Sequence, residues 1–233
     1  MPEIGDDDIL LQVKAAGICG GDTHQYYGDI EPTAYPRVAG HEGAGIIAAK
    51  GKNVSDYWQV GDRVATDNTY DACGRCECCA QGHFVACRNR VTLGFGADGV
   101  FAEYTKIPGR LLNLHPHCLL KLPDNVSFEE AVLLEAGSNC YKAMIQQAHL
   151  VPAENVVVYG MGALGLYCVQ WAKLGGAANI ISIGQESDKA IRFPIAEKLG
   201  ATHLLSSNSG IDVEAEVAKI VGDAGLHLSL IHI

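Results

Sequence analysis

The first half of the chain consists of short apolar runs separated by glycines. Residues 9–14 (ILLQVK) are mostly apolar with polar side chains at two positions, a pattern that predicts a β-strand. Further short apolar runs alternate with the glycines Gly17, Gly20, Gly21, Gly28, Gly40, Gly43, Gly45 and Gly51. Short strands joined by glycine-rich turns predict an irregular β-barrel rather than a helical domain.

The pattern changes after Pro123. Ser127 is followed three positions later by Glu130, a capping-box signature that predicts a helix starting there and extending towards His149. We place the boundary between the two halves near Val151, so that the first predicted domain covers residues 1–150.

Strands and helices alternate in the second half. Residues 155–159, 179–183 and 203–205 predict short strands. Helical stretches follow them: residues 163–174, a segment closed by Gly200, and residues 213–221. This alternation predicts a doubly wound parallel sheet. The predicted fold class is therefore α/β, with a barrel-like domain followed by a partial doubly wound sheet.

We expect both ends of the chain to be cut. The second half supplies three predicted strands, whereas an open doubly wound sheet normally has about six. The last residues, 228–233 (LSLIHI), do not fit a natural fourth strand after Gly225 and are typical of an adapter-derived tail. The second predicted domain therefore covers residues 151–227, and residues 228–233 are expected to be non-native.

Composition narrows the functional classes. Lysine and arginine total 17 and aspartate and glutamate 27, and this net charge of −10 argues against a nucleic-acid partner, because phosphate binding needs cationic side chains. No run approaches the ~20 consecutive apolar residues that a membrane span requires. The nine cysteines are odd in number, and the acidic N-terminal residues resemble no export signal. We therefore expect a cytoplasmic protein whose thiols bind metal.

Four of the cysteines form a closely spaced set: Cys73, Cys76, Cys79 and Cys87. Four thiolates on one loop suit a tetrahedral zinc that stabilises a lobe, here about residues 70–90, and takes no part in catalysis. An iron–sulfur site is an alternative, but its fourth cysteine follows after about three residues, whereas Cys87 follows Cys79 after seven. The register could also shift onto Cys78.

A second candidate metal site combines Cys19 with His41 and Glu42. A thiol, an imidazole and a carboxylate can hold zinc and leave one position open for water or substrate. A packed cysteine and a chance His-Glu pair is the alternative that the residue types leave open.

Gly160, Gly162 and Gly165 form a G-x-G-x-x-G pattern between a predicted strand and a predicted helix. Glycines in this context permit a tight turn, the approach of a pyrophosphate and close packing of helix on strand. The pattern predicts dinucleotide binding.

Together these signals resemble the zinc-dependent medium-chain alcohol dehydrogenases. Residues 40–54 (GHEGAGIIAAKGKNV) are similar to the zinc signature of that family, and the cysteine spacing and glycine triplet match as well. The resemblance covers the chain from about Pro2 to about Leu226. It implies a GroES-like catalytic domain followed by a Rossmann domain, with the active site in the cleft between them.

The resemblance also implies roles for single residues. Cys19 and His41 look like the first two ligands of a catalytic zinc, and Glu42 looks like the adjacent carboxylate that binds the ion directly or supports it from outside. Glu135 occupies the third ligand position, where ethanol-type members have cysteine. A carboxylate there resembles the sorbitol (L-iditol) and related polyol dehydrogenases. We expect Glu42 to act in catalysis as well.

His24 stands where the family keeps the outer histidine of its proton relay, and we expect it to accept a proton. The position two after Cys19 is usually serine or threonine but is Gly21 here, so that Thr23 or a water would have to replace the missing hydroxyl. Asp22 is expected to order the loop.

The choice of cofactor stays open between NAD and NADP. Gly184 takes the place, about 20 residues beyond the glycines, where an acidic residue usually binds the ribose. The missing acid, together with Lys189 and Arg192, favours NADP, whereas Glu186 and Asp188 favour NAD. We expect Gly184 and Arg192 to contact the cofactor.

The resemblance implies hydride transfer between a secondary alcohol, in particular a polyol or sugar alcohol, and the nicotinamide cofactor, with one catalytic and one structural zinc. The alternatives are a threonine-type or other small-alcohol dehydrogenase, or a non-catalytic nucleotide-binding member, which Gly21 would favour. Relatives are commonly dimers or tetramers, so a homo-oligomer is expected at full length, without nucleic-acid or membrane partners.

Overall fold

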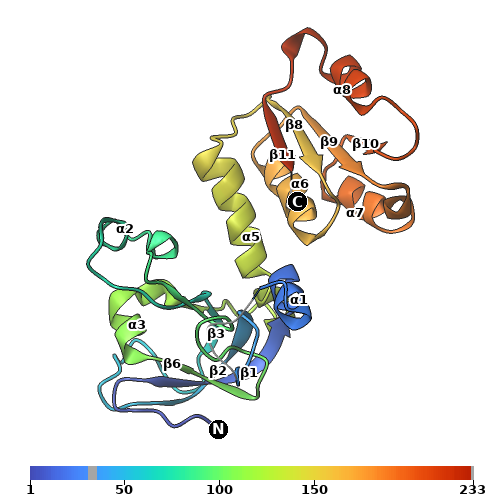
Figure 1. The fold of residues 1–233 in the computed structure, drawn as a ribbon. Coiled ribbons are helices and arrows are strands. Elements are labelled where there is room, and N and C mark those ends of the chain that lie inside the picture. The colour runs from blue at the N-terminus through green and yellow to red at the C-terminus, as the bar shows by residue number, and fades with distance from the viewer. Residues whose placement is uncertain (31–35, 232–233) are drawn as a thin grey trace. The chain divides into compact units, whose positions relative to one another are not determined.

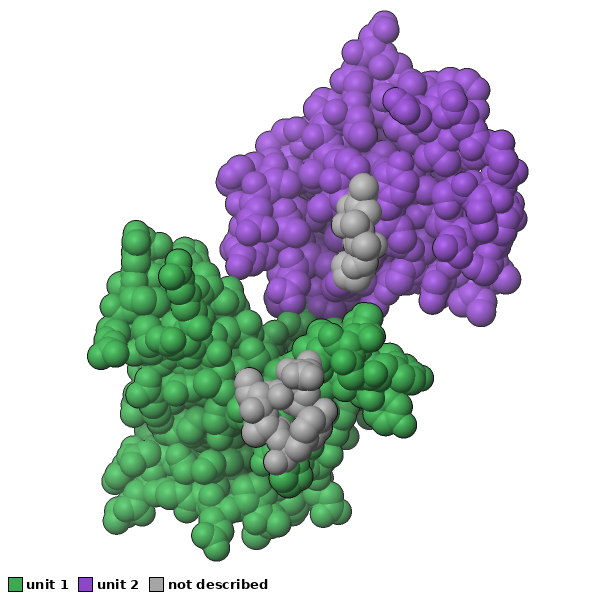
Figure 2. All heavy atoms as spheres, viewed as in Figure 1, with its two compact units in different colours: residues 1–135 green, residues 136–233 purple. Residues whose placement is uncertain are grey.

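The chain forms two compact units. The computed structural model describes residues 1–30 and 36–231 (Figure 1). Unit 1 comprises Met1–Glu135 and unit 2 comprises Ala136–Ile233 (Figure 2). This division precedes Val151, near which we place the domain boundary, because Cys140 and Met144 pack into the core of unit 2.

Unit 1 is built on a five-stranded antiparallel sheet. In spatial order its strands are β6 (Tyr104–Ile107), β1 (Ile9–Gly17), β2 (Glu42–Lys50), β3 (Arg63–Thr66) and β7 (Leu119–Lys121). The core on this sheet includes the buried side chains Ile9, Leu11, Ile47, Val64, Ile107 and Leu119. Alternate apolar residues of the strands thus face one interior, and the strand-rich character predicted for this half is confirmed.

The pairing of β1 with β2 determines which loops meet in unit 1. The register runs from Ile9 opposite Lys50 to Gly17 opposite Glu42. The end of β1 therefore lies beside the start of β2. Residues that follow Gly17 and residues that precede Glu42 are brought together, although they are far apart in sequence.

Short helices and a hairpin complete unit 1. The helices are α1 (Gly20–Tyr27), α3 (Gly109–Leu114), η2 (Pro116–Cys118) and α4 (Phe128–Ala131). The hairpin strands β4 (Thr69–Asp71) and β5 (Val91–Thr92) enclose a loop that contains α2 (Glu77–Ala80) and η1 (Phe84–Ala86). This loop carries the closely spaced cysteines.

The helix start predicted at Ser127 is confirmed. The Ser127 hydroxyl accepts the Glu130 N–H at 3.1 Å, and the Glu130 carboxylate accepts the Ser127 N–H at 2.8 Å. This reciprocal capping satisfies two backbone donors at the start of α4.

The prediction of one continuous helix from Ser127 towards His149 is wrong. After α4 the chain turns and continues as α5 (Leu134–Tyr141) and the π-helical segment η3 (Lys142–Gln147). Ala131 packs into the core of unit 1, whereas Met144 packs into that of unit 2. The two helical parts thus contribute to different cores.

Unit 2 is a four-stranded parallel sheet with helices on both faces (Figure 1). In spatial order its strands are β10 (His203–Ser206), β9 (Asn179–Gly184), β8 (Asn155–Tyr159) and β11 (Leu228–Ile231). Val156 and Val158 of β8 pack towards α6 (Ala163–Leu174) and α7 (Arg192–Leu199), and Val157 packs towards α8 (Val213–Val221). Both faces of β8 are therefore buried, as the sequence of this strand predicts.

The strand β11 differs from our expectation that residues 228–233 form no strand of the sheet. Leu228 and Leu230 pack against the core of unit 2, and burial of their side chains stabilises the strand. Residues 232 and 233 of the expected tail lie outside the described part of the chain. Two short 3₁₀ segments, η4 (Glu186–Ala190) and η5 (Gly222–Ala224), complete the unit.

Within residues 1–30 and 36–231, none of the helices has the length and apolar character needed to span a membrane.

Candidate functional site

Three side chains with metal-binding atoms meet where β1 ends and β2 begins. The ligand atoms of Cys19, His41 and Glu42 all lie within 4.8 Å of one another. The register of β1 and β2 explains this, because Gly17 lies opposite Glu42. A side chain at position 17 would displace the Glu42 carboxylate, because a Cβ on Gly17 would come within 2.2 Å of Glu42 Oε2.

Asp22 lies directly beneath this cluster. Its Oδ2 accepts the N–H of Cys19 at 2.9 Å, and its Oδ1 lies 3.4 Å from His41 Nδ1. Asp22 is 6% exposed, and both Asp22 Oδ1 and His41 Nδ1 are buried and make no hydrogen bond within the described part of the chain, although they face each other across 3.4 Å. Asp22 therefore orders the loop at Cys19, as the sequence predicts, and its second oxygen lies near His41 Nδ1, on the side from which carboxylates commonly support metal-binding histidines.

Negative charge crowds this cluster. Burial raises the pKa of Glu42, and the carboxylates of Glu135 and Asp22 raise it further. Burial by itself lowers the pKa of His41, but the hydrogen bond with Cys19 and the charge of Asp22 outweigh it, so that the pKa of His41 is raised. A cation among these groups would relieve the repulsion.

The donor set fits zinc. Bonds of about 2.0–2.3 Å place the ligand atoms of a tetrahedral zinc roughly 3.5 Å apart, and the Cys19, His41 and Glu42 atoms lie within 4.8 Å of one another, close enough to surround one ion after small side-chain movements. A thiolate, an imidazole and a carboxylate are ligands that zinc accepts, and three protein ligands leave a position open.

The second cluster consists of the four spaced cysteines. The ligand atoms of Cys73, Cys76, Cys79 and Cys87 lie within 4.8 Å of one another. Backbone N–H groups of Arg75 and Cys76 lower the pKa of the Cys73 thiol to about 6. The neighbouring thiol of Cys78 does not belong to this set, so the third cysteine of the set is Cys79 and not Cys78. Four thiolates without an open position suit a structural zinc.

The glycine triplet of unit 2 lies in a tight turn between β8 and α6. Gly160 has φ +87°, which favours glycine, and a Cβ on Gly165 would come within 1.8 Å of the Gly160 carbonyl oxygen. A Cβ on Gly162 would meet nothing within 4 Å. Two of the glycines are therefore needed by the turn itself, whereas the space beside Gly162 is open at the N-terminus of α6.

Among the residues predicted to determine the preference for NAD or NADP, Asp188 is buried and its carboxylate is already bonded to other residues of the protein. It is 5% exposed, accepts the N–H of Gln185 at 2.8 Å and pairs with Arg192 at 2.9 Å. A Cβ on Gly184 would come within 2.6 Å of Asp188 Oδ2. Packing thus accounts for Gly184. Glu186 forms an ion pair with Lys189 at 2.8 Å.

Known proteins match both parts of the chain. The family model described as the alcohol dehydrogenase GroES-like domain matches residues 5–124. The uncharacterized zinc-type alcohol dehydrogenase-like protein YdjL of Escherichia coli (strain K12) is 41% identical over 97% of this chain. The chain belongs to the zinc-type medium-chain alcohol dehydrogenases.

Two further relatives extend this comparison. Sorbitol dehydrogenase of Bacillus subtilis (strain 168) is 36% identical over 98% of this chain. A crystal structure of an NAD-dependent alcohol dehydrogenase, 27% identical, superimposes with a TM-score of 0.85 over 98% of this chain and 63% of the other. The chain spans 64% and 62% of the lengths of the Escherichia coli and Bacillus relatives. The predicted fold, a GroES-like domain followed by a Rossmann-like parallel sheet, is confirmed.

Glu135 lies near the Cys19, His41 and Glu42 cluster but is not one of its members. Within the described residues, the ligand atoms of Cys19, His41 and Glu42 are the ones that all lie within 4.8 Å of one another at this site. Glu135 affects the pKa values of His41 and Glu42 through its charge, and its Oε1 accepts the side-chain N–H of Asn68 at 2.6 Å. Its role as a zinc ligand stays a prediction.

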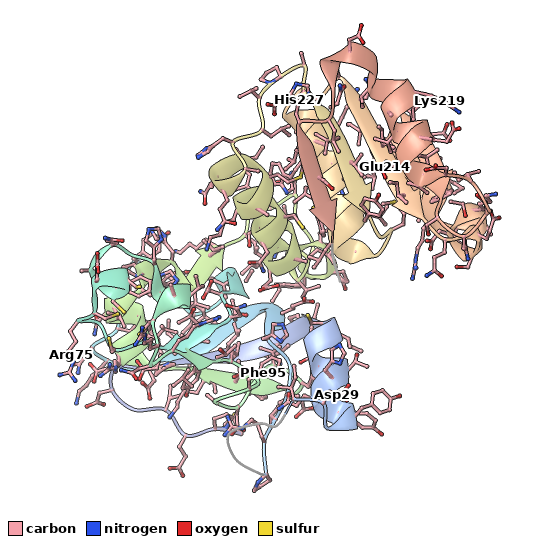
Figure 3. All side chains as sticks on the ribbon, turned by 45° about the horizontal axis from the view of Figure 1, so that its top comes forward. Asp29, Arg75, Phe95, Glu214, Lys219 and His227 are labelled. Atoms are coloured by element: carbon pink, nitrogen blue, oxygen red, sulfur yellow. The ribbon has the colours of Figure 1, made fainter. Side chains whose placement is uncertain are left out.

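The predicted relay residues lie on α1. His24 Nδ1 is 2.9 Å from Asp29 Oδ2, and both side chains are exposed; Asp29 is labelled in Figure 3. The Thr23 hydroxyl donates to the Cys19 carbonyl at 3.4 Å, so it takes part in the start of the helix. The role of His24 as a proton acceptor stays a prediction.

The ring of Phe95, labelled in Figure 3, lies beside Gly21. A Cβ on Gly21 would come within 3.2 Å of Phe95 Cζ, and the ring centroid lies 5.3 Å from that of His41. An aromatic ring therefore limits the space where relatives carry a hydroxyl. Sequence analysis missed Phe95, because nothing in its local pattern connects it to Gly21.

Proposed function

We propose that the chain is part of an enzyme that transfers a hydride between a secondary alcohol, a polyol or sugar alcohol, and a nicotinamide cofactor. The observation that carries this proposal is the meeting of Cys19, His41 and Glu42 within 4.8 Å. When bound, zinc supplies Lewis acidity towards the alcohol hydroxyl and the nicotinamide supplies the hydride acceptor.

The residues of unit 1 would bind the metal and move the proton. Cys19 and His41 would hold the metal together with a carboxylate from Glu42 or Glu135, and Asp22, whose Oδ1 lies 3.4 Å from His41 Nδ1, would orient the His41 ring. The exposed His24, paired with Asp29, is the group that would pass the substrate proton to solvent.

Two observations support a polyol or sugar alcohol as the substrate. Glu135 stands where ethanol-type relatives have cysteine, and its carboxylate lies in the field of His41 and Glu42. The relative sorbitol dehydrogenase is 36% identical over nearly the whole chain. Both agree with a substrate that carries several hydroxyl groups.

The test is a substrate panel with NAD and NADP offered separately. The zinc-loaded protein of which this chain is a part would be assayed with sorbitol, a polyol phosphate, threonine and a simple secondary alcohol. Reduction of either cofactor with the polyols at the highest kcat/KM is the expected result. Threonine as the best substrate would refute the substrate class, and no reduction with any alcohol would refute the proposal as a whole.

The glycines of unit 2 predict opposite effects of one added methyl group. Gly165→Ala is expected to destabilise unit 2 by about 1–3 kcal/mol or more, because its Cβ would overlap the Gly160 carbonyl and the overpacking must push α6 from β8. Gly162→Ala is expected to preserve the melting temperature but to weaken NAD(P)H binding, because its Cβ would occupy the space that a pyrophosphate needs.

Thermal unfolding and fluorescence titration with NADH and NADPH measure the two effects. Equal melting temperatures for the two variants would contradict the packing argument. Unchanged affinity for both cofactors in Gly162→Ala would contradict the placement of the pyrophosphate.

A further inference from the structure

The carboxylate of Glu135 is held by the side chain of Asn68. Asn68 Nδ2 donates to Glu135 Oε1 at 2.6 Å, in a partly buried setting. Asn68 lies between β3 and β4, and its backbone carbonyl accepts the N–H of Leu93 at 3.0 Å. The donor is therefore anchored by the hairpin that carries the cysteine loop.

Arg90 determines which end of the Asn68 amide faces Glu135. An Arg90 terminal nitrogen donates to Asn68 Oδ1, and a guanidinium has donors only. The amide oxygen must therefore face Arg90, and the amide nitrogen must face Glu135. Arg90 is itself placed by the cysteine loop, because its N–H donates to the Cys87 carbonyl at 3.0 Å.

The Arg90 side chain has little other support. Its Nε is buried without a hydrogen-bond partner, and burial lowers its pKa although the charges of Asp67 and Glu135 oppose this. Such a buried cation is costly unless a partner orders it. The contact with Asn68 is consequently a fixed part of unit 1 rather than a chance surface contact.

We infer that Asn68 is a positioning residue that selects which carboxylate binds the metal at the Cys19–His41 site, and that Arg90 fixes its amide in the required orientation. Asn68 binds the carboxylate of Glu135, whereas the carboxylate grouped with the thiol and the imidazole is that of Glu42. Two carboxylates thus share the neighbourhood of one site, and a neutral amide determines their order. The inference rests on the metal site of the proposed function.

The experiment measures which carboxylate the metal depends on. Co²⁺ affinity is determined by competition with a chelator and followed by the visible absorption of the ion, with Cys19→Ser as the blank for the cysteine loop. Glu42→Gln is expected to lower the affinity by more than about a hundredfold, beyond the range of roughly 10–100-fold that groups outside the ligand set cause, and Glu135→Gln by no more than about tenfold. In an Asn68→Leu background the order is expected to reverse, because Glu135 loses the hydrogen bond from the Asn68 amide.

Arg90→Met tests the same inference if Asn68→Leu does not fold. It allows the Asn68 amide to turn and is expected to reverse in part the order of the affinity losses caused by Glu42→Gln and Glu135→Gln. The matched Arg90→Lys keeps a donor and is expected to preserve that order. The same order of Glu42→Gln and Glu135→Gln in all backgrounds would overturn the inference. A chain that binds no more Co²⁺ than Cys19→Ser would instead overturn the metal site, and the inference with it.

Discussion

Replacing Cys19 with alanine is expected to remove one of two metal ions per chain and to lower kcat/KM by at least about a thousandfold, equivalent to about 4 kcal/mol of lost transition-state stabilisation. Cys19 supplies the only thiol of the set formed with His41 and Glu42 in the described residues. Without it, an imidazole and a carboxylate remain, and these bind zinc far more weakly than three ligands do.

Elemental analysis of the purified chain measures the first effect, and the assay with the best alcohol measures the second. Ile18→Ala is the matched control, because its side chain is adjacent and 79% exposed; it is expected to keep both metal ions. The thiol of Cys19 also lies at the start of α1, so circular dichroism must show that the helix persists. Two metal ions in a folded Cys19→Ala variant would refute the proposed site.

The parts of the site that lie close together in sequence could be predicted from it. The four cysteines lie on one loop, so their spacing alone predicts that their sulfurs meet, and they do so within 4.8 Å. The glycine turn is equally local, because Gly160 and Gly165 contact each other across a single strand–helix connection. Local geometry of this kind follows from chain length and backbone freedom.

The parts that depend on distant packing could not be predicted. Asn68 is joined to Glu135 only by the folding of unit 1, and no spacing rule connects them. Phe95 reaches Gly21 in the same way. The resemblance to a family predicts that Cys19, His41 and Glu135 share one site, but it does not predict the hydrogen bond between Asn68 and Glu135, on which our inference about the two carboxylates rests.

The secondary structure shows the same limit. The strand of residues 155–159 and the helix of residues 163–174 have the predicted bounds, because each has a complete apolar pattern. The break after α4 was not predicted, because both sides of it have helical character. Ala131 before the break and Met144 after it are buried in separate cores. Periodicity indicates that a face is buried but not against which unit.

Cys79→Ser is expected to unfold the cysteine loop, whereas Cys78→Ser, one position away, leaves it intact. Cys79 belongs to the four-thiolate set and is buried, whereas Cys78 lies outside it and is half-buried. The two substitutions change the same atoms in adjacent residues. A general effect of losing a thiol would therefore appear in both variants, and the zinc content separates the loss of a metal ligand from the loss of the packing that buried Cys79 provides.

The expected loss is large because the loop has little other core. Its buried cluster consists of Ala72, Cys79 and Cys87, with Phe84 and Leu114 packed against it. Metal binding contributes on the order of 10 kcal/mol to the folding of small zinc domains, and burial of so few apolar groups cannot replace it.

Hydrogen exchange over residues 73–92 and the zinc content of the two variants measure this effect. Cys79→Ser is expected to lose protection throughout the loop and one zinc per chain, and chelation of the unmodified chain should give the same pattern. Because Arg90 is anchored to Cys87 and contacts Asn68, loss of the loop should also weaken the Co²⁺ site at Cys19. Full protection in Cys79→Ser, or equal loss in Cys78→Ser, would show that the loop is stabilised by something other than the four-thiolate metal site.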